Sequence, residues 1–324
     1  MRRRIFMQSA VSLGLAASFS TLRAQEKYPS KPIKFVVPFA AGGGGDVVAR
    51  MLAQRLTERI NNPIVVENRT GAGGNIGTDF VLKSPPDGYT LLNMSSTYPI
   101  QAAVSAKLPF DPLQDMQPII MVSRDPVVLL VNANSPFKNA KDLYDAARRT
   151  PDKFTYGSAG VGSIAHLGME ELAFLMGIKL VHVPYKGSSQ AFTDLLGGQV
   201  DMMLTSATFS GPHIKGGKVR GLGIAGTQRM PTLAEVATFE EQGFRGYDVV
   251  DWKAVAGPRG MAPDVVAFLN RELNEVLKHK SVMEKFEAEG TTAVGGTPEQ
   301  MAQIVRADIQ RWKNVADKAK VKIE

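Results

Sequence analysis

The chain has 324 residues, which is enough for a large core and for two lobes. Hydrophobic residues make up 44% of it and charged residues 21%, values typical of ordinary globular proteins. The absence of cysteine excludes disulfides, thiolate catalysis and zinc sites built on cysteine. The histidines do not occur in pairs at ligand spacing, so we expect no metal site: His166, His182, His213 and His279.

Residues 1–24 have the pattern of a cleavable secretory signal peptide. Basic residues stand at Arg2–Arg4 and Arg23 without any acidic residue, the apolar run is Ala10–Leu22, and the small residue Ala24 marks the expected cleavage point. The apolar run is shorter than the ~20 residues that span a bilayer. Because this segment carries four basic residues, its removal lowers the formal net charge from +7 to +3, and we expect no nucleic-acid partner.

The order RRIFMQ at residues 3–8 also resembles a twin-arginine export signal, and an ordinary Sec signal is the alternative. Both routes lead out of the cytoplasm, so we expect the mature chain in the periplasm. ATP and NAD are scarce there, which weighs against a nucleotide-binding function.

Beyond the signal, strand and helix patterns alternate along the chain. Strands are expected at residues 33–39, 63–67, 89–93, 127–132, 154–157, 180–185, 200–205 and 221–225. Helices are expected at residues 47–60, 70–82, 140–149, 164–176, 189–196, 265–278 and 301–318. Asp46 is expected to cap the first helix, Pro263 to begin a later one, and Thr297–Gln300 to form a capping box. The alternation predicts an α/β fold whose parallel sheets are covered on both faces.

Two glycine-rich loops each join a strand to a helix. The first, AAGGGGD, ends at Asp46, and the second, SAGVGS, spans Ser158–Ser163. In open α/β sheets ligands bind beyond the carboxyl ends of the strands, and a helix N-terminus carries about half a positive charge. If each of two lobes contributes one loop, the free N–H groups and small hydroxyls would face one cleft. Such a cleft suits a carboxylate that is held without chemistry.

Two nucleotide-binding interpretations of these loops lack a required residue. A P-loop needs Lys followed by Ser or Thr, and none follows Gly42–Gly45. The segment Gly160–Ala165 fits the dinucleotide pattern G-x-G-x-x-A, but the next strand ends at Tyr185 and Lys186 without the acid that would hold a ribose.

A serine hydrolase is the alternative from the enzyme class. Neither Ser158 nor Ser163 has the glycines of G-x-S-x-G around it. His166 follows Ser163 by three residues on the same helical face, which suggests a Ser–His pair. The simpler interpretation is a histidine that forms a hydrogen bond near the helix start.

Five long strings are similar to those of the Bug family, the extracytoplasmic solute receptors of tripartite tricarboxylate transporters. They are VVPFAAGGGGDVVAR, NRTGAGGNIGTDFVLKSPPDGYTLL, TYGSAGVGSIAHLGMEEL, VPYKGSSQAFTDLLGGQVDMML and VRGLGIAGTQR. Two departures stand out. The family's usual LPDVPT is LAEVAT at residues 233–238, which puts the stiffness near the hinge in doubt. Residues 43–45 are all glycine where the family often has proline or threonine, which can alter the ligand that fits.

The resemblance implies a type II periplasmic-binding-protein fold, with two α/β lobes, a hinge and an interlobe ligand cleft. Residues 25–126 and 227–324 would form the first lobe and residues 127–226 the second, with crossovers near 127–132 and 221–225. The implied function is that of a monomeric receptor, not an enzyme. It captures a small carboxylate and delivers it to integral-membrane transporter subunits, without a cofactor or metal. The alternative is an exported hydrolase that acts on a small ester or acid.

The resemblance also assigns the cleft. Its lining would come from the first loop, residues 95–98, the second loop and residues 205–206, with Asp46 supporting the first loop. The groups expected to meet the carboxylate are those of Thr97, Ser158, Gly162 and Ser163. The ligand itself is left open among dicarboxylates, citrate-like acids, amino acids and aromatic acids. The full set of expected ligand-binding residues is Phe39, Ala40, Gly42, Gly43, Asp46, Ser95, Thr97, Ser158, Gly160, Val161, Gly162, Ser163, Thr205 and Ser206.

Overall fold

The computed structural model describes residues 28–319 and residue 321, so the expected signal peptide lies outside the described residues. The strands are β1 Ile33–Val37, β2 Ile64–Asn68, β3 Thr90–Ser95, β4 Met116–Asn132, β5 Thr155–Ser158, β6 Val181–Pro184, β7 Met202–Ser206, β8 Val219–Ile224, β9 Val250–Pro258 and β10 Thr292–Gly295. The helices are α1 Gly44–Ile60, α2 Asn75–Leu82, α3 Thr97–Val104, α4 Ala140–Arg149, α5 Ile164–Met176, α6 Ser188–Leu196, α7 Ala207–Lys215, α8 Pro263–Leu277, α9 Lys280–Glu289 and α10 Pro298–Ala319.

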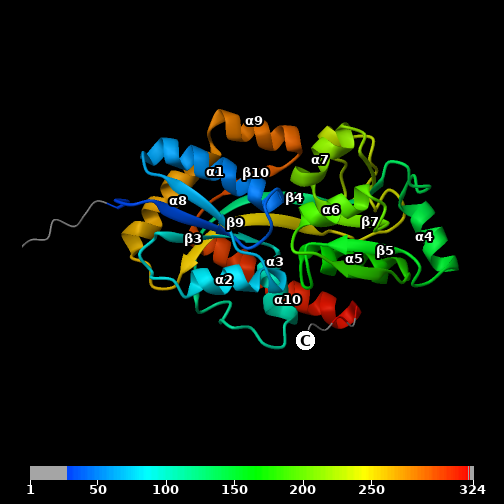
Figure 1. The fold of residues 1–324 in the computed structure, drawn as a ribbon, viewed down its shortest axis with the longest axis horizontal. Coiled ribbons are helices and arrows are strands. Elements are labelled where there is room, and N and C mark those ends of the chain that lie inside the picture. The colour runs from blue at the N-terminus through cyan, green and yellow to red at the C-terminus, as the bar shows by residue number, and fades with distance from the viewer. Residues whose placement is uncertain (1–27, 320, 322–324) are drawn as a thin grey trace, which may run out of the picture.

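The long strand β4 joins two halves of the sheet (Figure 1). The strand order is β2-β1-β3-β9-β4-β7-β5-β6, and β8 and β10 also pair with β4. The first part of β4, up to Pro126, pairs with β9 and β10, and the part from Val127 onward pairs with β7 and β8. We call the half with β1, β2, β3, β9 and β10 the first lobe, and the half with β5 to β8 the second lobe.

Each lobe contains the parallel pairs that the sequence predicts. β1 is parallel to β2 and β3, and β5 is parallel to β6 and β7. The sheet is not parallel throughout, however, because β4 and β9 pair antiparallel with their neighbours. These two strands carry the chain from one lobe to the other and back, so they run in opposite directions at the junction.

Helices cover both faces of each half of the sheet, because alternate strand residues are apolar on both sides. In β1, Phe35 and Val37 pack toward α1 and α8, whereas Val36 packs toward α2 and α10. In the second lobe, Leu129 of β4 packs toward α4 and α5, and Leu130 toward α6 and α7. The result is a three-layer arrangement in each lobe (Figure 1).

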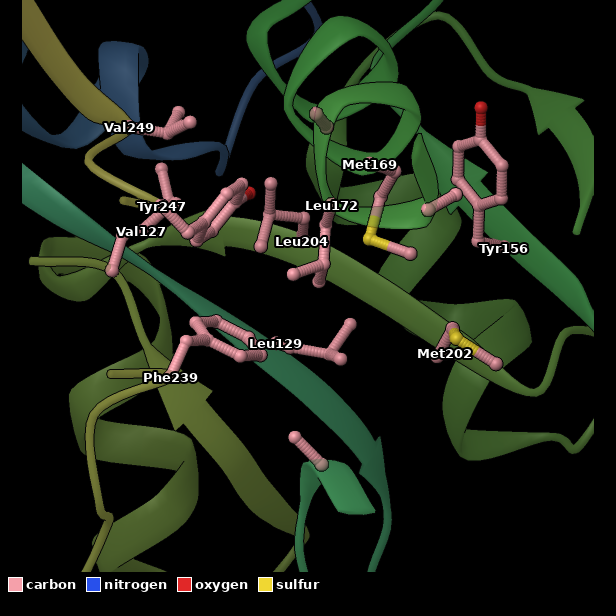
Figure 2. Packing of buried hydrophobic residues seen from close by; sticks show 14 of the residues in the cluster. Val127, Leu129, Tyr156, Met169, Leu172, Met202, Leu204, Phe239, Tyr247 and Val249 are labelled. Atoms are coloured by element: carbon pink, nitrogen blue, oxygen red, sulfur yellow. The ribbon is translucent and has the colours of Figure 1, made fainter. Parts of the chain in front are cut away.

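The segment between β8 and β9 packs with the second lobe. Phe239, Tyr247 and Val249 lie in one buried cluster with Val127 and Leu204 (Figure 2). The predicted lobe boundary at residue 227 stays a prediction, and this packing favours a return to the first lobe at β9.

Helix α10 contacts both lobes. Met301 and Val305, near its start, belong to the first-lobe core, while Trp312 belongs to the second-lobe core. Arg311 also forms an ion pair with Glu171 of α5, at 3.2 Å. The predicted capping box begins this helix as expected: Thr297 N–H donates to Gln300 Oε1 and Gln300 N–H donates to Thr297 Oγ1.

Candidate functional site

A cavity of about 50 Å³ lies between the two lobes, several times the space that one water molecule needs. The first lobe contributes the β1–α1 loop, the ends of β3 and part of β9. The second lobe contributes the β5–α5 loop, the start of α6 and the end of β7. The lining residues are Phe39, Ala40, Gly43, Gly44, Gly45, Asp46, Asn93, Ser95, Thr97, Ala159, Ser163, Ile164, Ala165, Ser188, Leu204, Thr205, Ser206, Asp251 and Lys253.

Five helices, α1, α3, α5, α6 and α7, begin at this cavity. Each places a residue of its cap or first turn in the wall: Gly44, Thr97, Ile164, Ser188 and Ser206. The first N–H groups of a helix have no acceptor inside it, and they carry the positive end of the helix dipole. Among the described residues, no acceptor pairs with the N–H groups of Gly44, Gly45 or Ala165. The cavity therefore offers donors and positive potential to an anion.

The glycines of the first loop serve two different purposes. Gly42 has a φ of +80°, which side chains disfavour. Gly44 lies so close to the second lobe that an added Cβ would stand 3.0 Å from Ser206 Oγ, and one at Gly45 would stand 3.3 Å from Asn93 Nδ2. The glycines let the start of α1 approach both β7 and β3.

Asp46 does not cap α1, and this expectation is corrected. The cap is Gly43, and Asp46 lies in the first turn, where its carboxylate accepts the N–H of Gly42 at 3.0 Å. Arg50 holds both carboxylate oxygens at 2.9 and 3.0 Å, and Asn68 Nδ2 donates to Oδ1 at 2.9 Å. Burial acts to raise the pKa of Asp46, but these hydrogen bonds outweigh it and hold the pKa below its ordinary value. These hydrogen bonds of Asp46 hold the first loop in its conformation.

In the second loop, Ser163 caps α5 by accepting the N–H of His166 at 3.3 Å. The ring Nδ1 of His166 accepts the N–H of Gly162 at 3.1 Å. This confirms the interpretation of His166 as a residue that forms a hydrogen bond near the helix start. It also means that the Gly162 N–H, expected to meet a carboxylate, is already paired within the loop.

The sequence did not indicate the partner of Ser158. Its hydroxyl lies 2.6 Å from His182 Nε2, and it also accepts the N–H of Gly160 at 3.0 Å. His182 stacks on His166, with ring centroids 4.0 Å apart, and on Tyr156. Ser158 is fully buried and does not line the cavity, so the Ser158–His182 contact supports the second loop and presents no accessible nucleophile.

Nine of the expected ligand-binding residues line the cavity: Phe39, Ala40, Gly43, Asp46, Ser95, Thr97, Ser163, Thr205 and Ser206. Gly42 is adjacent to it in the first loop. Gly160 and Val161 instead line a larger open groove of about 1070 Å³ at the rim of the lobes. Ser158 and Gly162 line neither.

Four polar residues of the wall were missed: Asn93 of β3, Ser188 at the start of α6, and Asp251 and Lys253 of β9. Lys253 is only 2% exposed, and its Nζ donates to Asp251 Oδ2 at 2.5 Å and lies 3.8 Å from Asp125 Oδ2. Burial lowers the pKa of Lys253, but the two carboxylates raise it more, so the ammonium stays charged. The sequence did contain a signal for Asp251 and Lys253, because they are charged residues within the otherwise apolar strand β9.

The lobes touch each other around the cavity. Ser189 Oγ donates to the carbonyl of Ala41 at 2.9 Å, and Gln101 Nε2 donates to the carbonyl of Val161 at 2.8 Å. Ile164 N–H donates to Thr97 Oγ1 at 3.3 Å. These bonds hold together the loops that surround the cavity.

Within residues 28–319, no three His, Asp or Glu side chains gather closely enough to hold a metal ion. Over the same described part of the chain, none of the helices has both the length and the apolar character needed to cross a bilayer.

Residues 48–321 match the family model of the tripartite tricarboxylate transporter family receptors. The chain belongs to this receptor family. It is similar to the periplasmic binding protein BugD, with 33% identity, a TM-score of 0.89, and coverage of 92% of this chain and 100% of BugD.

The receptor is also similar to two proteins solved with carboxylates. One is Rpa4515 of R. palustris with adipate, at 33% identity and a TM-score of 0.88, covering 91% of this chain and 99% of the other. The other is MatC of Rhodopseudomonas palustris with bound malate, at 30% identity and a TM-score of 0.86, covering 89% and 99%. The predicted Bug family and two-lobe periplasmic-binding-protein fold are therefore confirmed.

Proposed function

We propose that this receptor captures a small carboxylate in the periplasm and delivers it to the membrane subunits of a tripartite tricarboxylate-type transporter. The observation that carries the proposal is the set of five helix N-termini around one interlobe cavity, where the N–H groups of Gly44, Gly45 and Ala165 have no acceptor among the described residues. Such groups favour anions without the need for a lysine or arginine. Similar receptors hold adipate and malate, which are both carboxylates.

Two further features support binding over catalysis. The Ser158–His182 pair is buried behind the second loop, away from the cavity wall. The charged side chains of the wall are already paired, Asp46 with Arg50 and Asp251 with Lys253. No hydrolytic role is proposed, and the ligand leaves the receptor unchanged.

The test is a substitution at the start of α5. Ser163→Asp places a negative charge in the wall while keeping a side chain that caps helices well. Carboxylate binding, measured by calorimetry with malate and adipate, should fall at least ~10-fold, and the melting temperature without ligand should change little. A carboxylate that still binds Ser163→Asp with full affinity would place the site elsewhere.

The matched control is Asn139→Asp at α4, where Asn139 caps the helix by accepting the N–H of Asp142 at 2.9 Å. This variant makes a similar change of cap in the second lobe and should bind carboxylates like the wild type. The amide of the same acid should bind neither protein, because a neutral group gains little from a helix N-terminus.

A further inference from the structure

One wall of the cavity belongs to a row of polar side chains on a single face of the sheet, of which Asn93, Ser95, Asp251 and Lys253 line the cavity. In the pairing of β3, β9 and β4, Lys253 stands opposite both Ser95 and Ser123, and Asp251 stands opposite Asp125. Residues paired in this way project to the same face, and so do residues two positions apart in one strand. We call this row the polar floor; its members are Asn93, Ser95, Ser123, Asp125, Asp251 and Lys253.

The polar floor contains buried acceptors without donors. Among the described residues, Asn93 Oδ1, Ser123 Oγ and Asp125 Oδ1 have no hydrogen-bond partner. Asn93 is 2% exposed and lines the cavity. Its amide orientation is fixed, because Nδ2 donates to the carbonyl of Gly45 at 3.1 Å and a flipped amide would set two oxygens against each other.

The polar floor also has an unused donor. The ammonium of Lys253 has three N–H groups, and its one hydrogen bond within the described chain goes to Asp251 Oδ2. Lys253 pairs with Ser95, two residues beyond Asn93 on the same face, so Asn93 and Lys253 are diagonal neighbours. Asn93 Oδ1 therefore needs a hydrogen-bond donor, and the nearby Lys253 ammonium can donate to an acceptor.

A hydroxyl group satisfies both, because it donates one hydrogen bond and accepts others. A methylene group satisfies neither and leaves Asn93 Oδ1 buried without a partner. An ammonium group donates to Asn93 but is repelled by the Lys253 ammonium at close range. We propose that the ligand is a hydroxy acid, whose carboxylate faces the helix N-termini and whose hydroxyl lies between Asn93 and Lys253. This inference rests on the proposed function, since the carboxylate must occupy the cavity.

The test compares matched acids on the wild-type receptor by titration calorimetry. One set is malate, succinate and aspartate, and the other is lactate, propionate and alanine. The hydroxy acid of at least one set should bind about 10- to 100-fold more tightly than its deoxy analogue, and the amino acid should bind more weakly than the hydroxy acid. Equal affinity for the hydroxy and deoxy acids, or tighter binding of the amino acid, would overturn the inference and leave the carboxylate function standing. If the receptor binds only acids without a hydroxyl group, such as adipate, the hydroxy-acid inference also fails and the carboxylate function stands. Failure of every carboxylate would overturn both.

Asn93→Leu then tests the residue. It removes the acceptor at similar size, and the ratio of hydroxy-acid to deoxy-acid affinity should fall toward one. The control is Asn62→Leu, because Asn62 is also a buried asparagine whose Nδ2 donates to a carbonyl, that of Lys31 at 2.9 Å, outside the cavity. It should keep the wild-type ratio. An unchanged ratio in Asn93→Leu would assign the selectivity elsewhere and contradict the proposal. If Asn93→Leu does not fold, the wild-type ratio still decides the ligand class.

Discussion

His166 and His182 are neutral residues that shape the second loop. Burial lowers the pKa of His166 to about 4, and burial together with the nearby His166 lowers the pKa of His182 to about 3. The His166 ring can accept the Gly162 N–H only while Nδ1 is unprotonated. Protonation would therefore break a bond that fixes the loop in front of α5.

The pH dependence of stability follows from these pKa values. Because the folded values lie below the ordinary 6.5, the two histidines stabilise the fold fully above pH 6.5, and this contribution is lost as the pH falls toward 4. Asp125 acts in the opposite direction: burial raises its pKa to about 6, so its contribution is lost as the pH rises from about 4 to 6. The two histidines shift further than the one aspartate, and together these three groups lower stability in acid.

We expect His166→Gln to flatten this dependence. Glutamine can still accept the Gly162 N–H but does not titrate, so the fall in melting temperature between pH 6.5 and pH 4 should be smaller than in the wild type. Thermal unfolding across that range measures it. An identical slope in the two proteins would contradict the role of His166 in the loop.

At the scale of elements, the sequence predicted the helices and strands whose patterns are local. The limits of α4 and α5 match the expected residues 140–149 and 164–176, and both glycine loops join a strand to a helix as predicted. Helix α9 and strands β9 and β10 were missed, and so were helices α3 and α7, which both begin at the cavity. Each of these last two helices follows its strand without a turn signal, and α7 even contains Pro212.

Contacts between distant residues could not be predicted from local patterns. Ser158 meets His182 across 24 positions of sequence, and Ser96 meets Asp251 across 155. The sequence could predict that the first loop lines the cavity, because the strand before it, its glycines and the start of the following helix are consecutive in the chain. Asn93, Asp251 and Lys253 come together only through the pairing of β3, β9 and β4.

Helix α10 ties the two lobes together, and Trp312 is its anchor in the second lobe. Trp312 is 2% exposed, so Trp312→Ala removes a large buried side chain and should lower the free energy of unfolding by ~3–5 kcal/mol. Chemical denaturation measures this effect. The neighbouring exposed Lys313→Ala is the control and should stay within about 0.5 kcal/mol of the wild type. Equal stability of the two variants would show that α10 does not anchor the second lobe.

At the scale of the whole molecule, two lobes share β4 and α10, and their loops meet over a cavity lined from both sides. A ligand in that position stabilises the arrangement in which the lobes touch, as in hinge closure. The surfaces that touch include Ala41 with Ser189 and Gln101 with Val161. The proposed capture of a ligand would therefore use the same contacts that position the helix N-termini.

Export is the second whole-molecule prediction, and it concerns residues 1–24. We expect the mature protein in a periplasmic extract to begin at or near Gln25, which N-terminal sequencing would establish. Replacing Arg3 and Arg4 together by lysine should block export if the twin-arginine route is used. Unchanged export would assign the chain to the Sec route, whereas an uncleaved N-terminus in the periplasm would contradict the signal-peptide prediction.

The central claim is that the helix N-termini between the lobes hold a carboxylate. A crystal structure of the receptor grown with malate tests it most directly. We expect a carboxylate oxygen within about 3 Å of the N–H groups of Gly44, Gly45 or Ala165, with both lobes in contact with the ligand. Malate bound in the open groove beside Gln101 instead, with the helix starts facing only water, would contradict the claim.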